Sequence, residues 1–400
     1  MNALHHTGAD TMDFRYTPEQ ERFRTEIRAF LRENVSDELR REIAVSGHSP
    51  GPLGKAFLRL LGERGWLGIG WPREYGGQGR SMIEQTIFYH ELDLQDIHYG
   101  NLTITSLAMA LMKLASEAQK QQYLSRILKG ELEICLGYTE PGAGSDLAGI
   151  TTRAVRVGDE YVINGQKVFT TGAHYASHIW LLARSEADAP RHKGLSVFIF
   201  PLATAGITVH PIYTMEGIRT NEVFFDDVRV PASAMIGKPG SGFPTAAIAL
   251  DFERVFMGKY TKLRRNLDAL VHECRQSLDG SAPPFDDPVV RDRLVGLHLD
   301  VERLRLLCLK SAWMIDQGQV PNAEASAQKV FASDLEQRLA DEGIRILGPR
   351  GQLEYGSAHV PAHGHLAQSW LLSPMLRFGG GANEIQRDII AQRGLGLPRA

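Results

Sequence analysis

Residues 138–146, YTEPGAGSD, combine side chains and glycines in a way that suits close binding of a ligand. Gly142 and Gly144 lack side chains and tolerate positive φ angles, so a flat or phosphorylated ligand can approach the backbone there. Thr139 and Ser145 add hydroxyl groups beside the exposed amides. The alternative is an ordinary Pro-Gly turn followed by a helix cap at Ser145. The segment therefore predicts either a ligand-binding loop or a plain turn.

Glu253 is a carboxylate inside the apolar helical run AIALDFERVFM, where an unpaired charge is unfavourable. Asp251 and Arg254 are three residues apart and can pair on one helix face, whereas Glu253 lies on another. Burial beside a ligand would raise the pKa of Glu253 through desolvation, which suits a general base. The alternative is a surface ion pair of Glu253 with Arg254 or Lys262.

The bulk composition is that of an ordinary globular protein. The chain has 400 residues, of which 43% are hydrophobic and 23% charged, and its formal net charge is −3. This length exceeds a single core, so we expect two or three domains. The sequence predicts neither nucleic-acid binding nor a membrane span, because it lacks a basic surplus and a long apolar run. Three widely spaced cysteines predict neither a disulfide framework nor a metal site, and a cytoplasmic location fits them best.

Hydrophobic periodicity divides the chain into helical, strand-rich and helical parts. In the strand-rich part, Asn164-Gly165 within YVINGQKVF predicts the turn of a β-hairpin. We expect helices from Thr17 and over 53–64, 81–94, 101–114, 117–128, 243–275, 288–315 and 323–347. The expected division is a flexible leader at 1–11, an N-terminal helical domain at 12–130, a middle β domain at 131–240 and a C-terminal helical bundle at 241–400.

Five segments resemble the acyl-CoA dehydrogenase flavoproteins in the order of that family, over nearly the whole chain from Met12. They read GWPREYGGQG, YTEPGAGSD, NGQKVFTTGA, DVRVP and EIQRDIIAQRGLGLPR. The resemblance implies an α+β multidomain fold with an N-terminal all-α domain, a central antiparallel β-barrel and a C-terminal four-helix bundle. It also implies FAD-dependent removal of an α-proton and a β-hydride from an acyl-CoA thioester, which gives a trans-2-enoyl-CoA.

The resemblance further implies which residues contact the flavin. Thr171 would lie near the reactive nitrogen of the flavin, and Ser145 would also line the start of the acyl-CoA channel. For residues 169–171 the alternative is a strand with cross-strand threonine pairs. The implied FAD contacts are Tyr138, Thr139, Gly144, Ser145, Phe169, Thr170, Thr171, Ala382 and Glu384.

The catalytic base is where this sequence departs from many members of the family. Many carry the base as a glutamate in the C-terminal loop, but FGGGANEIQR places Gly380 at that position. Other members carry it on the first long helix of the C-terminal domain, and LDFERV matches that pattern with Glu253. The resemblance then assigns Arg254 to the thioester and nucleotide end of the substrate. It assigns the backbone N–H groups of Gly380 and Gly381 to the thioester oxygen.

Two loops that a subunit of the family lends to its neighbour's FAD also differ here. At 275–288 the chain reads RQSLDGSAPPFDDP, in which Arg275 matches the family but Leu278 and Asp279 replace Phe-Gly. At 345–351 it reads RILGPRG, and Pro349 removes an N–H and fixes φ. These changes predict an α2β2 heterotetramer with a paralogous subunit, similar to bacterial sterol side-chain dehydrogenases. The alternative is a homotetramer with a rewired adenine site.

The sequence bears on three other function classes. A flavin monooxygenase or oxidase of the same fold usually dispenses with the α-carbon base, so Glu253 argues against it. A non-catalytic partner subunit conflicts with the intact YTEPGAGSD loop. A metal hydrolase is disfavoured because HVPAHGH at 359–365 lacks a carboxylate or cysteine partner. An electron-transfer flavoprotein is the expected electron acceptor by analogy alone, and the sequence leaves the acyl group open, a branched or sterol side chain included.

Overall fold

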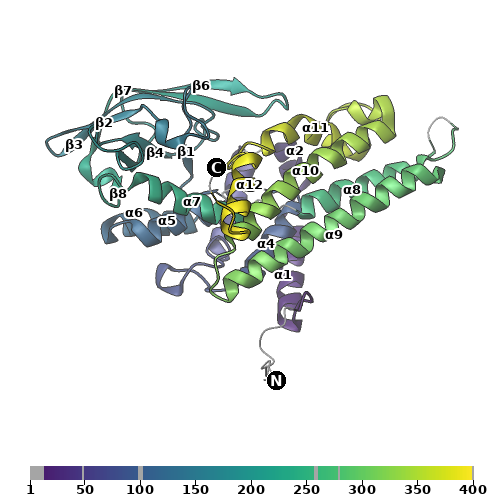
Figure 1. Ribbon diagram of the computed structural model, residues 1–400. Coiled ribbons are helices and arrows are strands. Elements are labelled where there is room, and N and C mark those ends of the chain that lie inside the picture. The colour runs from purple at the N-terminus through teal and green to yellow at the C-terminus, as the bar shows by residue number, and fades with distance from the viewer. Residues whose placement is uncertain (1–12, 47–48, 98–101, 256–259, 278–279, 399–400) are drawn as a thin grey trace, which may run out of the picture.

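A computed structural model describes residues 13–46, 49–97, 102–255, 260–277 and 280–398 of the chain, with the backbone alone described at 251–255. Figure 1 shows a sheet at one end of the molecule, with α5, α6 and α7 beneath it and long C-terminal helices extending away. The order of helices, sheet and helices confirms the predicted fold class.

The N-terminal part is helical because polar caps precede amphipathic segments. Thr17, Ser81 and Ser116 each form a capping box, in which the hydroxyl accepts an N–H and a side chain three residues later returns a bond. These boxes start three of the predicted helices. The helices are α1 (Pro18–Asn34), α2 (Asp37–Ser46), α3 (Pro52–Glu63), α4 (Met82–Leu94), α5 (Ala108–Leu114) and α6 (Glu117–Leu128), with a 3₁₀ turn η1 (Arg73–Tyr75) and a π-helix η2 (Leu102–Leu107).

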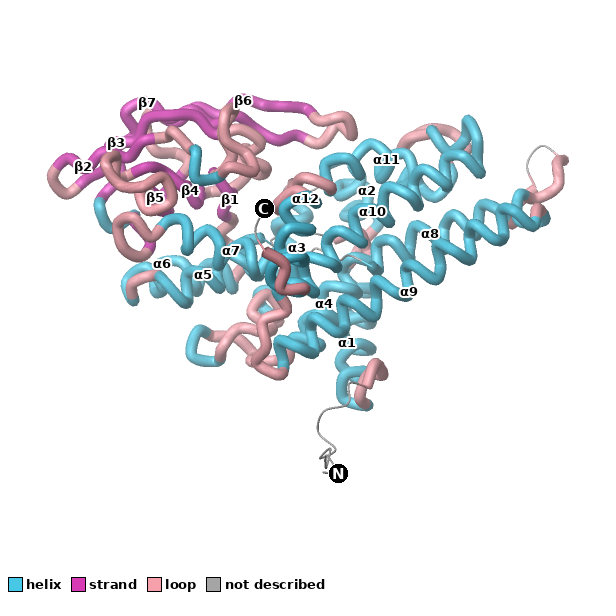
Figure 2. The backbone as a smooth tube through the Cα atoms, in the orientation of Figure 1, coloured by secondary structure: helices cyan, strands magenta, loops and turns pink. Residues whose placement is uncertain are grey.

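The middle part is an eight-stranded sheet made mostly of antiparallel pairs. Its order is β6-β7-β3-β2-β4-β5-β8, and β1 pairs with β4 (Figure 2). The pairs of β4 with β1 and with β2 are parallel, whereas the other pairs are antiparallel. The strands are β1 (Ile134–Gly137), β2 (Arg153–Val157), β3 (Glu160–Lys167), β4 (His178–Arg184), β5 (Leu195–Pro201), β6 (Ile207–Tyr213), β7 (Arg219–Pro231) and β8 (Met235–Ile236).

The hairpin turn predicted at Asn164-Gly165 is wrong. β3 runs through both residues, and the tight turn lies earlier, at Gly158, between β2 and β3. Asn164 instead exchanges two hydrogen bonds of 2.9 Å with Asp227 of β7. Gly165 lies at a register shift with a φ of 150°, and a Cβ there would sit 2.6 Å from Thr152 Oγ1. The pair therefore forms a β-bulge where two backbones approach closely.

β4 and β5 are buried on both faces because each face packs against a different layer. Trp180 belongs to the core shared with the N-terminal helices, whereas Leu181 belongs to the core inside the β domain. Alternate residues of a strand point to opposite faces, which accounts for this division. Helix α7 (Gly242–Val255) joins the first core through Ala246 and Ala249. Burial of each large apolar side chain here stabilises the fold by roughly 1.5–3 kcal/mol.

The C-terminal part is a set of long helices around its own core. The predicted helical segment at 243–275 is divided between α7 and α8, and residues 256–259 lie outside the described part. Asp287 caps α9 with its carboxylate, and Pro288 occupies the first helical position, as its fixed φ favours. The helices are α8 (Tyr260–Cys274), α9 (Pro288–Asp316), α10 (Asn322–Leu347), α11 (His365–Leu376) and α12 (Asn383–Ile389), followed by the π-helix η8 (Ile390–Gly394).

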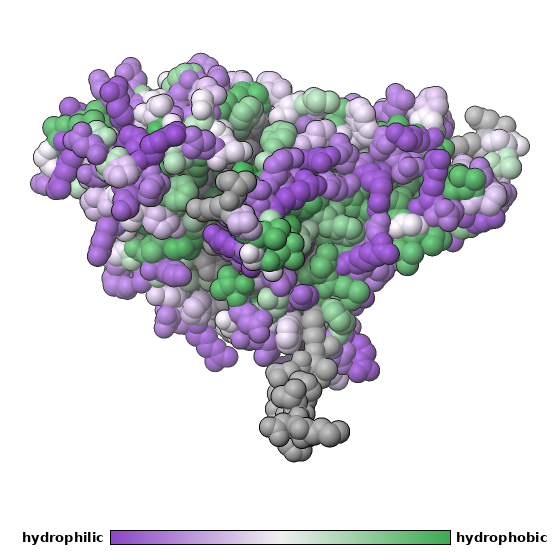
Figure 3. All heavy atoms as spheres, viewed as in Figure 1, coloured by the Kyte–Doolittle hydropathy of each residue, from purple (hydrophilic) through white to green (hydrophobic). Residues whose placement is uncertain are grey.

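The surface is mixed in polarity, with hydrophilic residues over most of the face in Figure 3 and hydrophobic ones between them. On α9, Val295, Leu299 and Leu306 are 56%, 50% and 37% exposed. Within the described ranges, none of the helices is both long and apolar enough to cross a membrane.

Candidate active site

A buried ion pair holds the loop at residues 138–146 in place on its buried side. Lys167 at the end of β3 and Glu140 in the loop are almost fully buried, and Lys167 Nζ lies 2.8 Å from Glu140 Oε1. Lys167 also donates to the carbonyl oxygen of Tyr138 at 3.0 Å. Glu140 accepts three more hydrogen bonds, from the N–H and hydroxyl of Thr151 and the N–H of Thr152, at 2.6, 2.8 and 2.9 Å. The network ties the loop to β3 and to the start of β2.

Both groups of this pair are charged at neutral pH. Burial opposes the charge of Glu140, but Lys167 and the surrounding donors outweigh it and lower the pKa of Glu140 to about 2. Burial lowers the pKa of Lys167 to about 8, and the Glu140 carboxylate offsets part of that effect. The pair therefore stabilises the loop and does not exchange protons near pH 7.

The loop itself leaves its glycine backbone open to a ligand. Glu140 and Ala143 exchange two backbone hydrogen bonds of 3.0 Å, which close the turn. A Cβ at Gly142 or Gly144 would meet nothing within 4 Å. Within the described part of the chain, the N–H groups of Gly144 and Ser145 have no hydrogen-bond acceptor. The helix cap considered for Ser145 is absent there, since the short η3 (Leu147–Gly149) follows Asp146 without a side-chain cap.

Phe169 presents an aromatic ring beside this loop in a strained conformation. Its φ of 55° is left-handed, which is rare for a bulky residue, and its side chain is 60% exposed. The neighbouring N–H of Val168 donates to the carbonyl of Thr139 at 2.9 Å, which joins the segment to the loop. Thr170 is buried, and its hydroxyl has no hydrogen-bond partner among the described residues. The hydroxyl of Thr171 lies 3.1 Å from another threonine hydroxyl on β7, which is the kind of threonine pair that the strand alternative predicts. Thr171 itself lies beyond the end of β3.

The sequence analysis missed a polar bridge that supports this segment. Asn221 of β7 accepts from the N–H of Thr170 through its carbonyl and donates to the Thr170 carbonyl through Nδ2, both at 2.9 Å. His174 lies 3.1 Å from the Asn221 amide through Nδ1 and 2.8 Å from Ser49 Oγ through Nε2. Burial lowers the pKa of His174, and Arg219 adds to that effect. The partners of His174 lie 47 and 125 residues away, so spacing gives no signal for them.

A second glycine turn lies between α11 and α12. Gly380 and Gly381 have φ values of 65° and 95°, which favour glycine. Their N–H groups have no hydrogen-bond acceptor in the described ranges. Ala382 occupies the N-cap position of α12 without a side-chain cap, and Glu384 in the first turn has a 77% exposed side chain that lies 3.9 Å from Arg387. The turn therefore offers free donors of the kind that bind an oxyanion or carbonyl oxygen.

Glu253 and Arg254 lie in the last turn of α7, and their side chains are outside the described part of the structure. The backbone before them is fixed, because Ser106 of η2 donates to the Ala249 carbonyl at 2.6 Å. Position 253 follows Ala249 by four residues and Ala246 by seven, so it shares a helix face with these two buried alanines.

The structure joins the predicted site residues in two ways. One hydrogen bond, from the N–H of Val168 to the Thr139 carbonyl, places Thr139 beside the segment that contains Phe169 and Thr170. α7 and α12 both pack against α10. The ring of Tyr138 is buried, and its hydroxyl accepts from Trp180 Nε1 at 3.0 Å. It supports the loop from the core side.

The arrangement fits a flavin. A flat ring needs an exposed apolar surface, and a pyrophosphate needs backbone donors that side chains do not cover. Phe169 supplies the first, while Gly144 and Ser145 supply the second. The buried Thr170 hydroxyl is an unsatisfied group at the same edge.

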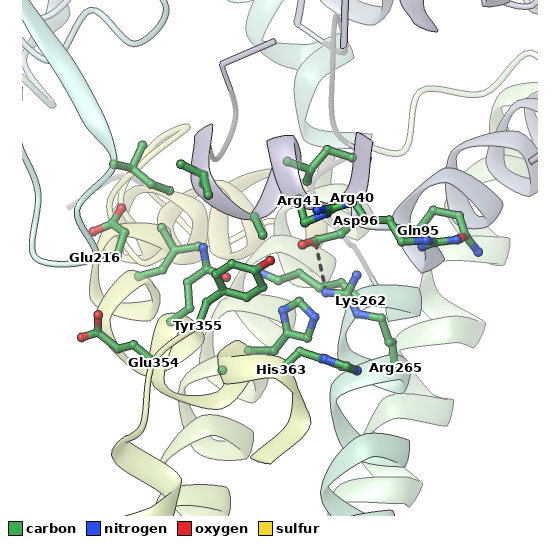
Figure 4. A pocket seen from close by; sticks show the side chains of 18 of the residues that line it. Arg40, Arg41, Gln95, Asp96, Glu216, Lys262, Arg265, Glu354, Tyr355 and His363 are labelled. Carbon is green, nitrogen blue, oxygen red and sulfur yellow. Dashed lines mark hydrogen bonds and ion pairs between the residues drawn. The ribbon is translucent and has the colours of Figure 1, made fainter. Parts of the chain in front are cut away.

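A separate cavity of about 750 Å³ lies between α2, α8 and α11, and none of the predicted site residues line it. In Figure 4, Lys262, Arg265 and Asp96 lie toward one end, and Glu216 and Glu354 toward the other. Two of its cations are paired with carboxylates, as Arg265 lies 3.0 Å from Asp96 and Lys262 lies 2.6 Å from a glutamate of α10.

Comparisons with known proteins agree across the chain. The acyl-CoA dehydrogenase N-terminal, middle and C-terminal domain families match residues 17–131, 135–228 and 240–395. The acyl-CoA dehydrogenase FadE26 of Mycobacterium tuberculosis is 36% identical over 399 residues, covering 97% of this chain and 100% of the relative.

Two solved structures share this fold and about a third of its residues. The Tcur3481-Tcur3483 steroid ACAD has a TM-score of 0.91 and 35% identity, with 97% of this chain and 100% of the other covered. The ChsE4-ChsE5 complex from Mycobacterium tuberculosis has a TM-score of 0.90 and 36% identity, with the same coverage of 97% and 100%.

Proposed function

This chain belongs to the acyl-CoA dehydrogenase family of flavoproteins, and from that premise we propose that it uses FAD to convert a saturated acyl-CoA thioester into its trans-2-enoyl-CoA. The observation that carries the proposal is the pairing of the open YTEPGAGSD loop with the exposed, strained Phe169. Strain of this kind is usually retained where a ligand uses the group.

We propose Glu253 as the base that removes the α-proton. Position 253 shares a helix face of α7 with the buried Ala246 and Ala249, and Gly380 stands where many members of the family carry their glutamate. Burial against the substrate is expected to raise the pKa of Glu253, mainly by desolvation, toward the range in which a carboxylate accepts protons at neutral pH. Arg254, next to it, is proposed to face the thioester and nucleotide end of the substrate.

The N–H groups of Gly380 and Gly381 are proposed to bind the thioester oxygen. Negative charge develops on that oxygen as the α-proton leaves, so donors fixed beforehand stabilise the transition state more than the ground state. The absence of other acceptors for these two N–H groups among the described residues supports the assignment.

FAD, when bound, would supply the acceptor for the β-hydride. We propose that Gly144 and Ser145 bind it through their N–H groups, with Phe169 against the ring. The buried ring of Tyr138 would support the loop from its core side, where its hydroxyl accepts from Trp180 Nε1. The remaining proposed contacts are Thr139, Thr170, Thr171, Ala382 and Glu384.

We further propose a CoA thioester of a sterol side chain as the substrate and an α2β2 heterotetramer as the assembly. The names of the steroid ACAD and of the two-component ChsE4-ChsE5 complex support this, since both match the whole chain. So does Pro349, which lies in the 3₁₀ turn η6 (Gly348–Gln352) where a neighbour's FAD would need free N–H groups. An electron-transfer flavoprotein is the proposed electron acceptor.

The test uses the FAD-containing protein, co-purified with its paralogous subunit where the chain alone lacks FAD. It is anaerobic reduction of the bound flavin, read as loss of visible absorbance, by a panel of fatty acyl-CoA and sterol side-chain acyl-CoA thioesters. Glu253→Gln is expected to keep its flavin and lose at least ~10²-fold in the rate of reduction, because a general base contributes at least that much. Asp251→Asn, two residues away, is the matched control. An unchanged rate in Glu253→Gln would remove this residue from the mechanism. A wild-type protein whose flavin no acyl-CoA reduces would overturn the function itself.

A further inference from the structure

Lys329 of α10 is a buried ammonium that holds both ends of the second glycine turn. Its exposed fraction is 2%, and its Nζ donates to the Arg377 carbonyl at 3.1 Å and to Asn383 Oδ1 at 2.8 Å. These acceptors flank residues 378–382. Among the described residues, no carboxylate lies within 4 Å of Lys329 Nζ. The charge is therefore satisfied by neutral oxygen atoms, an expensive arrangement in a protein interior.

Asn383 completes the closure of the turn. It is fully buried, and its N–H donates to the same Arg377 carbonyl at 2.8 Å. Its Nδ2 donates to Ser333 Oγ at 3.0 Å and to Asp334 Oδ1 at 3.2 Å, both on α10. Lys329 and Asn383 thus fix the position of the turn relative to α10.

The turn rests directly on a buried amide. A Cβ on Gly381 would lie 2.6 Å from Nε2 of Gln386, which is fully buried. Neither polar atom of the Gln386 side chain has a hydrogen-bond partner among the described residues. The amide of Gln386 therefore fills the space that a side chain at position 381 would need.

From these contacts we infer that Lys329 is a positioning residue for the reaction, which holds residues 377–383 so that the N–H groups of Gly380 and Gly381 meet the thioester oxygen. The inference rests on the proposed function of that turn. Lys329 acts through the backbone and does not touch the substrate. Burial lowers the pKa of Lys329 to about 8, with Asp334 and Glu384 acting against that and Arg377 and Arg387 adding to it. The ammonium form therefore predominates at pH 7.

The test separates carbonyl recognition from general binding. Two ligands are built on the acyl group that reduces the flavin most efficiently: its 2-enoyl-CoA thioester and the S-alkyl-CoA thioether of equal length, which lacks the carbonyl oxygen. Lys329→Met keeps the length of the side chain and removes the charge. In this variant the ratio of the thioether Kd to the thioester Kd is expected to fall about tenfold, which is the effect of one hydrogen bond. The thioether Kd itself is expected to stay unchanged.

Lys262→Met is the matched control, because this lysine of α8 is also largely buried but pairs with Glu336 away from the turn. It is expected to keep the wild-type preference. If Lys329→Met does not fold, Ser333→Ala retains the ammonium and removes the hydrogen-bond contacts between Ser333 Oγ and Asn383, with an expected loss of about threefold. A wild-type preference in the folded variant, or an equal loss for both ligands, would overturn the inference and leave the proposed function standing. A wild-type flavin that no acyl-CoA reduces would overturn both.

Discussion

Removing the charge of Lys167 is expected to destabilise the protein strongly, because it leaves Glu140 buried without its cation. The side chains of Lys167 and Glu140 are 0% and 4% exposed, and their charged atoms are 2.8 Å apart. Breaking a buried ion pair by removing one partner costs about 3–5 kcal/mol. The three remaining donors to Glu140 offset part of this penalty. We therefore expect Lys167→Met to lower the free energy of unfolding by about 3 kcal/mol, the low end of that range.

The assay is urea unfolding followed by circular dichroism at pH 7. Arg191→Met is the control, since its ion pair with Asp146 has side chains that are 67% and 61% exposed and is expected to matter by less than about 0.5 kcal/mol. The double variant Lys167→Met, Glu140→Gln is expected to regain part of the loss, because no buried charge remains. A loss below about 1 kcal/mol in Lys167→Met would refute the reasoning, as a solvated pair would give that value.

The same pair has a defined pH signature. The pKa of Glu140 is about 2 in the folded protein, below its ordinary value of 4.5. A group with a lowered folded pKa contributes its stability above the unfolded pKa and loses it as the pH falls toward the folded one. The wild type is therefore expected to lose this contribution between pH 4.5 and about pH 2, and the double variant is expected to lack that part of the acid sensitivity.

Two further predictions concern pH and assembly. Burial lowers the pKa of His90 from 6.5 to about 4, so as the pH falls the unfolded chain takes up this proton before the folded protein does, and the free energy of unfolding decreases between these two values. His90→Phe is expected to flatten this dependence of the unfolding free energy on pH, measured by urea unfolding at pH 7.5, 6 and 5. An unchanged dependence would contradict the prediction. If a paralogous subunit completes the FAD site, the chain purified alone is expected to hold far less than one FAD per chain by visible absorbance, and co-expression with that subunit to restore it; near-stoichiometric FAD in the chain alone would argue for a homomer.

Local sequence predicted most elements because their signals are local. The caps at Thr17 and Asp287 and the apolar periodicity after them start α1 and α9 where expected. Helix α2 was not predicted, since only Leu39 and Ile43 of its ten residues are buried and the rest is largely charged. At Asn164-Gly165, by contrast, the local signal was strong but did not decide the structure. Its strong turn propensity is overridden by Asp227, which lies 63 residues away in sequence.

The sequence predicted the loops of the candidate site but not the side-chain contacts that hold those loops in place. Glycines and hydroxyls in one short segment can be identified from the sequence alone, as for Gly144 and Ser145. The partners of Lys167 and Lys329 lie 27, 48 and 54 residues away, and their contacts depend on how the domains fold back. The sequence does not mark these lysines as buried, because α10 and β3 both contain other polar residues and lysine is usually exposed.

The two buried lysines support the two glycine turns by the same means, yet they differ in what their removal should change. Each ammonium donates to a backbone carbonyl beside its turn, Lys167 to Tyr138 and Lys329 to Arg377. Lys167 also neutralises a buried carboxylate, so its loss is chiefly a loss of stability. Lys329 has no carboxylate within 4 Å among the described residues, so replacing it with methionine leaves only polar, uncharged acceptors unsatisfied. Lys329→Met should therefore have a higher free energy of unfolding than Lys167→Met but a weaker preference for the thioester over the thioether. The reverse order in both measurements would show that the two lysines have been assigned to the wrong roles.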